Sequence, residues 1–248
     1  MKNTIHFVLQ GKGGIGKSFI SALLAQMFKQ KKDLLFTGYD TDQENTTFAQ
    51  YKALDVEHIP VMDDSRQINT KKFDVLIEKL LMTEGVSVVD NGANTFAPLL
   101  AYMLENNVID LLNENGRKVY IHTIVGGGDT MSDSANGFNS IANGLNAPVV
   151  LWINEFFGEM KTIEGKSFFE TKVFKAHEDK LVGLVILHKR NSTTFGDDIK
   201  KMTTRRLTVY EVMGSDEFSI MEKQRIGTFS RDVFSQIEKI NWSKSSWT

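Results

Sequence analysis

GKGGIGKS, at residues 11–18, is the most informative stretch of this 248-residue sequence. It satisfies the pattern G-x-x-x-x-G-K-[S/T], follows the apolar run at residues 5–10 and opens a helix-like pattern at Lys17. Glycines allow successive backbone N–H groups of such a loop to fold around a phosphate, and the helix N-terminus adds the positive end of its dipole. In this mechanism the lysine reaches the β- and γ-phosphates and the serine hydroxyl ligates Mg²⁺. The stretch therefore predicts a phosphate-binding loop in which Lys17 and Ser18 have these roles.

Short β-branched runs alternate with helix-like stretches along the chain. The predicted strands lie at residues 5–10, 34–39, 85–90, 118–125, 149–154 and 182–188, and the predicted helices at 17–31, 70–82, 98–112, 129–145 and 220–240. The strand runs are almost continuously apolar, which is typical of a parallel sheet covered on both faces. We therefore predict an α/β, three-layer P-loop NTPase fold, with a mostly parallel twisted sheet and helices on both faces. We expect a single domain over residues 1–248, with an embellishment at about 155–180.

Composition excludes several classes of protein. The chain has no cysteine, which excludes disulfides, cysteine-ligated iron–sulfur or zinc sites and thiol nucleophiles. A net charge of −2 gives no overall attraction to nucleic acid or anionic lipid. No run reaches the roughly 18 apolar residues of a membrane span, and the first apolar run is too short for a signal peptide. We expect a cytoplasmic protein without stable membrane insertion, and we interpret its histidines as structural because they show no metal-ligand spacing.

A second lysine, Lys12, follows the first glycine of the loop. KGGIGKS resembles the deviant Walker A signature of the ParA/MinD superfamily of P-loop ATPases. The resemblance implies ATP and Mg²⁺ as cofactors, and an ATP-dependent homodimer in which Lys12 reaches the partner's phosphates. It makes Lys12 and Lys17 catalytic candidates. It also assigns nucleotide binding to the loop and the residue after it, namely Gly11, Lys12, Gly13, Gly14, Ile15, Gly16, Lys17, Ser18 and Phe19.

Carboxylates at the ends of two predicted strands complete the candidate site. Asp40 and Asp42 follow the second predicted strand, and Asp90 ends the third. The carboxyl ends of parallel strands share one edge of the sheet with the loop, where carboxylates hold Mg²⁺ and orient the attacking water. The resemblance makes the first segment switch I, with Asp42 as the residue that positions water, and makes Asp90 the start of switch II. The predicted magnesium residues are therefore Ser18, Asp40, Asp42 and Asp90.

Both switch segments depart from the superfamily pattern. Gln43 stands where proline is usual, and Asn91-Gly92 replaces the common Thr-Pro-Pro. Asn154 ends a predicted strand where the superfamily often has an asparagine that contacts adenine. A strand-end asparagine that bonds only within the chain explains this residue nearly as well, so the identity of the base stays open.

Two surface features have alternative interpretations. A basic cluster suits either nonspecific DNA binding or a solvated helix face, and we favour the second because the whole chain is slightly acidic. A C-terminal apolar stripe suits either a membrane contact or packing on the domain, and its acidic neighbours favour packing. The cluster is Lys200, Lys201, Arg205 and Arg206, and the stripe is Phe229, Val233, Phe234, Ile237 and Ile240.

Several motifs, the first of which overlaps the loop, are similar to the TraL family of plasmid conjugal transfer proteins. They are VLQGKGG at 8–14, DTD at 40–42 with Asn45, DNGA at 90–93, FAPL at 96–99, TFGDD at 194–198 and RLT at 206–208. This resemblance implies a plasmid-encoded cytoplasmic protein that serves conjugation or plasmid maintenance, with an unidentified plasmid transfer or partition protein as its partner.

Three functional hypotheses follow from these observations. The first is a slow Mg²⁺-dependent ATPase that acts as a nucleotide-dependent dimerisation switch. The second is an ATP-controlled binding module with negligible turnover that recruits a protein or DNA. A small-molecule kinase or ligase is the third and least favoured, because no polar constellation suggests a substrate pocket. The redox branches of the superfamily are disfavoured because they need cysteine ligands.

Overall fold

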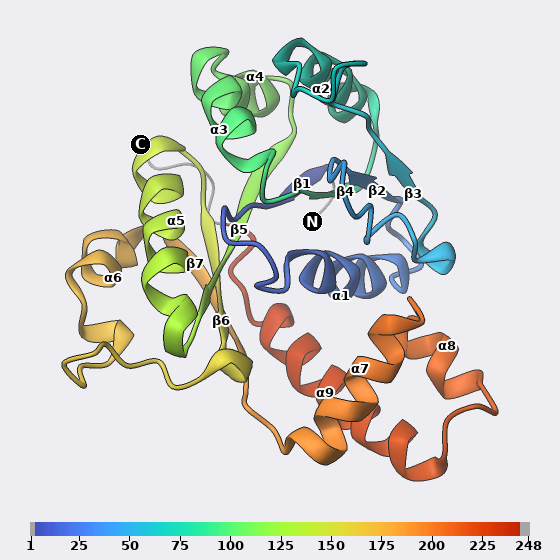
Figure 1. Ribbon diagram of the computed structural model, residues 1–248. Helices are drawn as coiled ribbons and strands as arrows, with labels where there is room; N and C mark the ends of the chain where they lie inside the picture. The colour runs from blue at the N-terminus through green and yellow to red at the C-terminus, as the bar shows by residue number, and fades with distance from the viewer. Residues whose placement is uncertain (1–2, 244–248) are drawn as a thin grey trace.

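A parallel sheet forms the centre of the molecule in the computed structural model, which describes residues 3–243 (Figure 1). Within these residues seven strands pair in the order β3-β2-β4-β1-β5-β6-β7, and every neighbouring pair is parallel. The strands are β1 (Thr4–Val8), β2 (Phe36–Asp40), β3 (Val56–His58), β4 (Val86–Asp90), β5 (Lys118–Gly126), β6 (Val149–Asn154) and β7 (Leu181–Leu187). The predicted α/β fold with a parallel sheet is confirmed.

Helices cover both faces of this sheet, as Figure 1 shows. One face packs against α1 and α9, and the other against α2, α3, α4 and α5. Because side chains alternate along a strand, Val8 of β1 faces the first layer and Phe7 faces the second. The helices are α1 (Lys17–Lys29), α2 (Phe73–Met82), α3 (Phe96–Glu105), α4 (Val108–Glu114), α5 (Met131–Gly144), α6 (Lys172–His177), α7 (Asp197–Thr204), α8 (Val209–Gly214) and α9 (Ile220–Glu238).

Several boundaries differ from the sequence prediction. The single helix predicted at 98–112 is wrong, because Asn107 adopts a left-handed backbone with φ 48° and separates α3 from α4. Asparagine tolerates this conformation better than most residues do. The helical spacing of apolar residues continues from α3 into α4, so it does not reveal the break at Asn107. The short elements β3, α6, α7 and α8 were not predicted at all. The predicted single domain extends beyond the described residues at both ends and stays a prediction.

The segment at 155–180 contains short helices rather than a strand of the sheet. After the 3₁₀ turn Glu155–Phe157, an isolated antiparallel bridge joins Lys161 to Ser167. The 3₁₀ turn Phe168–Glu170 and α6 then pack with α5 and β6 in a small apolar cluster that includes Phe168 and Phe174. This excursion thereby covers the outer side of α5.

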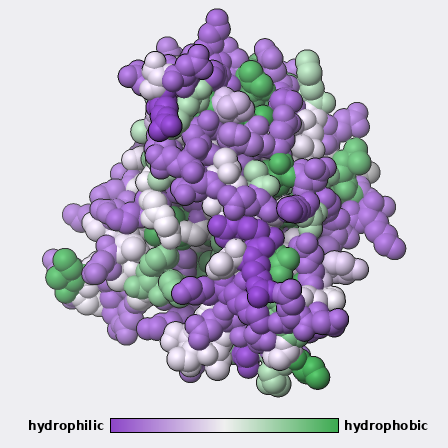
Figure 2. All heavy atoms as spheres, turned by 45° about the vertical axis from the view of Figure 1, so that its right-hand side comes forward, coloured by the Kyte–Doolittle hydropathy of each residue, from purple (hydrophilic) through white to green (hydrophobic). Residues whose placement is uncertain are grey.

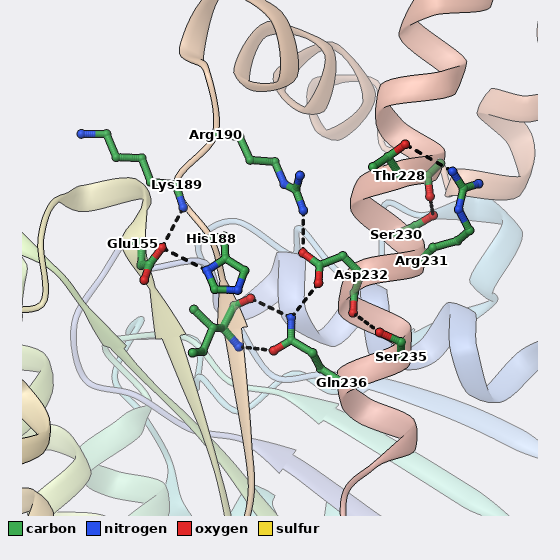
Figure 3. A network of polar contacts seen from close by, with 12 residues as sticks. Glu155, His188, Lys189, Arg190, Thr228, Ser230, Arg231, Asp232, Ser235 and Gln236 are labelled. Atoms are coloured by element: carbon green, nitrogen blue, oxygen red, sulfur yellow. Dashed lines mark hydrogen bonds and ion pairs between the residues drawn. The ribbon is translucent and has the colours of Figure 1, made fainter.

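Helix α9 packs beside β7, one of the two edge strands of the sheet. Gln236 accepts a hydrogen bond from the Ile186 N–H over 2.7 Å and donates to the Ile186 carbonyl over 3.1 Å, so its side-chain amide pairs with β7 as a neighbouring strand would (Figure 3). An ion pair of 2.5 Å between Arg190 and Asp232 adds a second link. The C-terminal apolar stripe packs inward with the core, as expected from its acidic neighbours.

A row of buried polar side chains crosses the strands beneath α1. Trp152 Nε1 donates to His122 Nδ1 over 2.9 Å, so the proton of this imidazole sits on Nε2. His122 then donates to His6 Nδ1 over 3.0 Å, and His6 Nε2 lies 3.0 Å from the Thr4 hydroxyl. Burial lowers the pKa of His122 to about 3 and that of His6 well below its ordinary value. Both histidines are therefore neutral structural residues.

No helix within residues 3–243 is long and apolar enough to cross a membrane. On the face that Figure 2 shows, hydrophilic residues predominate and hydrophobic atoms form small separate groups.

Candidate functional site

The glycine-rich loop lies between β1 and α1, at the carboxyl edge of the sheet. Gly14 and Gly16 have φ values of 70° and 106°, in the left-handed region that favours glycine. Gly16 is the residue that caps the N-terminus of α1. The loop also passes close to α3, because a side chain at Gly11 would approach the Phe96 ring within 2.9 Å. Glycine is thus required here by both backbone conformation and close packing.

Lys17 points back into the loop from the first turn of α1. Its ammonium donates to the Lys12 carbonyl over 3.1 Å, and only 7% of the residue is exposed. Burial lowers the pKa of Lys17, and the nearby carboxylates of Asp90 and Asp42 oppose this effect. The structure therefore brings Lys17 together with two of the three predicted acidic residues, Asp42 and Asp90.

Lys12 has a different environment. Its ammonium makes an ion pair of 2.7 Å with Asp133 on α5, and the two side chains are 35% and 63% exposed. Exposed ion pairs of this kind contribute about 0–1 kcal/mol, so the pair opposes reorientation of Lys12 only weakly.

Asp90 ends β4 directly beside α1 and is fully buried. Its Oδ1 accepts the Ser21 hydroxyl over 2.8 Å, and the Ser18 hydroxyl is near enough to the carboxylate to lower its pKa slightly. Its Oδ2 has no hydrogen-bond partner within the described part of the chain. Burial, with a smaller contribution from Asp40, raises the pKa of Asp90 to about 7. A buried carboxylate oxygen without a partner, beside a serine hydroxyl, fits the donor set of a Mg²⁺ ion.

Among residues 3–243 no group of three or more His, Cys, Asp or Glu side chains is arranged to hold a metal ion. Mg²⁺ sites of nucleotide-binding proteins usually need only one or two carboxylates, since phosphates and water supply the other ligands. The residues present therefore fit a magnesium ion that arrives with a nucleotide.

Asp40 organises residues 40–51, which contain the segment that the resemblance makes switch I. Its Oδ1 accepts the Asp42 N–H and its Oδ2 accepts the Ala49 N–H, each over 2.9 Å. The side chain is fully buried, and burial raises its pKa although both hydrogen bonds oppose the shift. Because both oxygens bond to backbone, Asp40 in this structure joins the two ends of the segment.

Asp42 lies against the segment that begins at Asp90, which the resemblance makes switch II. Its Oδ1 accepts the N–H groups of Glu44 and Asn45 over 3.0 and 3.3 Å. A side chain at Gly92 would lie 2.9 Å from its carboxyl carbon, so the two switch segments touch at this point. Asp42, Asp90 and Lys17 therefore share one site, although Lys17 and Asp90 are 73 positions apart in the sequence.

Gln43 and Asn91 stabilise these two segments through side-chain hydrogen bonds. Gln43 donates to the Ile59 carbonyl over 3.1 Å and lies 3.0 Å from the His58 ring, which ties switch I to the end of β3. In switch II, Asn91 donates to the Thr95 hydroxyl over 2.7 Å, and this hydroxyl donates to the Gly92 carbonyl. Side-chain hydrogen bonds thus shape both turns.

Asn154 holds the loop from the end of β6. Its amide donates to the Ile15 carbonyl over 3.0 Å, and its oxygen accepts the Phe156 N–H over 3.2 Å. Both polar groups of the side chain bond to backbone in this structure, and the contact of Asn154 with adenine stays a prediction.

Two further residues of the site were missed in the sequence. Ser21 lies three residues after Ser18 on α1, a spacing that places both hydroxyls on the same helix face and was available as a signal. Gln10 contacts the loop through its side chain, and although it lies in the VLQGKGG motif, no local pattern indicates this contact.

The basic cluster is largely paired within the chain. Lys201 lies 2.8 Å from Glu222, Arg205 pairs with Glu217, and Arg206 donates to Gln50 over 3.1 Å. These contacts favour a structural role for the cluster over DNA binding.

Comparison with known proteins agrees with this architecture. No protein-family model matches the chain. Two curated proteins named TraL from Escherichia coli are each 37% identical over 236 residues, which cover 94% of this chain and 97% of theirs. The crystal structure of a ParA family ATPase from Chlorobium tepidum TLS has a TM-score of 0.54 at 14% identity, covering 92% of this chain and 97% of that chain. The MinD cell division protein of Aquifex aeolicus has a TM-score of 0.51 at 12% identity, covering 94% and 97%. The chain therefore has the fold of the ParA and MinD ATPases.

Proposed function

The chain belongs to the TraL family, and we propose that it is a Mg²⁺-dependent ATP-binding and ATP-hydrolysing protein of the ParA/MinD type. In this proposal it acts in the cytoplasm as a nucleotide-dependent dimerisation switch in plasmid conjugal transfer or plasmid maintenance. The observation that carries the proposal is the buried Oδ2 of Asp90, which has no partner among the described residues and lies in the same site as Lys17 and the Ser18 hydroxyl.

Each residue of the site has a defined task in this proposal. The loop N–H groups and Lys17 bind the phosphates, while Ser18 and Asp90 hold the metal. When bound, Mg²⁺ neutralises charge on the phosphate oxygens. Asp42 orients the attacking water, and Asp40 keeps the Asp42 backbone in place through its 2.9 Å hydrogen bond. Lys12 leaves its exposed ion pair with Asp133 and reaches the phosphates bound by a second copy of the chain.

The switch I segment holds the Asp42 carboxylate through backbone hydrogen bonds. In this structure Asp42 Oδ1 accepts two backbone N–H groups, which leaves Oδ2 to orient a water molecule. A carboxylate already engaged within the chain also suits a second candidate function, an ATP-controlled binding module with negligible turnover. No observation favours a small-molecule kinase or ligase, and we do not propose one.

Fluorescence titration with mant-ATP and a phosphate-release assay test the proposed chemistry. Lys17→Ala is expected to abolish nucleotide binding, whereas Lys29→Ala at the other end of the same helix preserves it. Asp42→Ala is expected to preserve binding and stop phosphate release, with the neighbouring Glu44→Ala as its control. A wild-type protein that binds no ATP would overturn the proposal, and an Asp42→Ala variant with normal turnover would overturn the role of Asp42.

Light scattering with and without Mg²⁺-ATP separates the two candidate functions. Dimerisation together with phosphate release supports the ATPase switch. Dimerisation without detectable phosphate release supports the binding module instead. The partner in either case is an unidentified plasmid transfer or partition protein.

A further inference from the structure

Gln10 joins the glycine-rich loop to two other elements of the fold. Its Oε1 accepts the N–H groups of Gly11 and Lys12 over 2.8 and 3.4 Å. Its Nε2 donates to the carbonyls of Ile124 in β5 and Ser134 in α5 over 2.6 and 3.0 Å. The residue is fully buried, and each atom of its amide group has partners. An apolar side chain of similar volume at this position would leave all four backbone groups without these bonds.

Helix α5 is shaped to receive this amide. A Cβ atom at Gly137 would lie 1.9 Å from Gln10 Oε1, 2.8 Å from Cδ and 3.0 Å from Nε2. Glycine at position 137 therefore provides the space that the amide occupies. The same helix is attached to the end of β5, because the Ser134 hydroxyl accepts the Gly126 N–H over 3.1 Å. The start of α5, the end of β5 and the first turn of the loop thus form one connected unit around Gln10.

We propose that Gln10 is a positioning residue for the nucleotide site, which sets the first turn of the glycine-rich loop against α5 through the Gly11 and Lys12 N–H groups. It acts on phosphate binding through these two residues. The effect on nucleotide affinity rests on the proposed function, whereas the effect on the loop of the free protein does not. The two parts are therefore measured separately.

NMR-detected hydrogen exchange of the nucleotide-free protein tests the geometric part. Gln10→Met removes the hydrogen bonds while keeping a long side chain, and Gly137→Ala forces the amide away from the helix. Both variants are expected to accelerate exchange of the Gly11 and Lys12 N–H groups by about tenfold. Gly144→Ala is the matched control, because a Cβ there meets only leucine side-chain atoms, the nearest at 3.4 Å. Unchanged exchange in both variants would overturn the proposal, whether or not the protein binds nucleotide.

Affinity for mant-ATP tests the functional part. Gln10→Met and Gly137→Ala are expected to raise the Kd about tenfold, whereas Gly144→Ala leaves it unchanged. A purely structural glutamine would lower the urea midpoint of unfolding and leave the Kd of the folded protein at its wild-type value, which would contradict a positioning role. If the wild-type chain binds no mant-ATP, the proposed function fails, and the exchange result still decides the geometric part.

A double-mutant cycle shows whether the two residues act through one contact. Gln10→Ala leaves room for a methyl group, so adding Gly137→Ala to this variant is expected to have no further effect on the Kd. Fully additive effects would mean that Gly137 influences the loop by another route, and would overturn the link through α5.

Discussion

Ser21 donates its hydroxyl hydrogen to Asp90 Oδ1 over 2.8 Å, one helical turn beyond Lys17. The same hydroxyl lies 3.1 Å from the Lys17 carbonyl, a longer distance than to the carboxylate. The hydrogen bond orients the carboxylate and leaves Oδ2, the oxygen without a partner in the described chain, available to a metal ion.

Ser21→Ala is therefore expected to weaken Mg²⁺ binding without removing a ligand. Partners that orient a metal ligand typically contribute roughly 10-fold to 100-fold in metal affinity. The check is a Mg²⁺ titration of mant-ATP binding, with Ser140→Ala as the control because that hydroxyl bonds only to its own helix. An unchanged Mg²⁺ requirement in Ser21→Ala would remove Ser21 from the site.

Lys12→Ala is expected to abolish ATP-dependent dimerisation, because the proposed contact is with phosphates of the second copy. Asp133→Asn removes the ion-pair partner and is expected to retain dimerisation. It should change the free energy of unfolding by less than about 1 kcal/mol, since both side chains are partly exposed. Light scattering and urea unfolding measure these outcomes, and dimerisation by Lys12→Ala would disprove the role of this lysine.

Gln236→Ala is expected to lower the free energy of unfolding by about 1–2 kcal/mol. The substitution leaves the N–H and carbonyl of Ile186 without the side chain that pairs with them at the edge of β7. Urea unfolding monitored by circular dichroism is the measurement. Ser235→Ala, on the same helix with an exposed hydroxyl, is the control and should stay close to wild type (Figure 3). Equal stability of the two variants would show that the edge contact contributes nothing.

Stability is expected to fall on acidification because of the buried histidine pair. An unfolded histidine has a pKa near 6.5, whereas burial lowers the pKa of folded His122 to about 3. Between these pH values the unfolded chain binds more protons than the folded chain. The contribution of His122 to the free energy of unfolding is therefore fully present above about pH 6.5 and is lost as the pH falls toward 3. The slope is about 1.4 kcal/mol per pH unit for each such histidine.

Urea unfolding at several pH values between 4 and 7 checks this expectation. His122→Gln should reduce the slope, whereas His188→Gln, at a half-exposed position, should leave it unchanged. The same slope in His122→Gln as in the wild type would contradict the assignment of the acid sensitivity to this buried row.

Elements with strong local patterns were predicted well. The predicted strand at 149–154 coincides with β6, and the predicted start of α1 at Lys17 is the observed one. The three residues of β3 were missed because so short an edge strand has no periodicity to read. The break at Asn107 was also missed, because the apolar pattern continues across a single left-handed residue.

Some residues of the candidate site were likewise predicted from the sequence, and the arrangement of others was not. GKGGIGKS identified the loop, and strand-end carboxylates identified Asp42 and Asp90 as residues that share a site with Lys17. The structural arrangement of Asp40, with both oxygens bonded to backbone, was not visible in the sequence. Asn154 could not be assigned either, because its partner at Ile15 is 139 residues away.

The sequence by itself determined the α/β fold class, the glycine-rich loop and the exclusion of cysteine chemistry. The exclusion of cysteine chemistry depends on composition alone. The fold class and the loop depend on spacings within a few residues, because local backbone sterics and side-chain periodicity determine helices, strands and turns. Only the tertiary structure decided the strand order, the Ser21–Asp90 hydrogen bond and the fit of Gln10 against Gly137. Each depends on packing between residues that are distant in the chain, 124 positions apart for Gln10 and Ser134, and no local pattern encodes such a meeting.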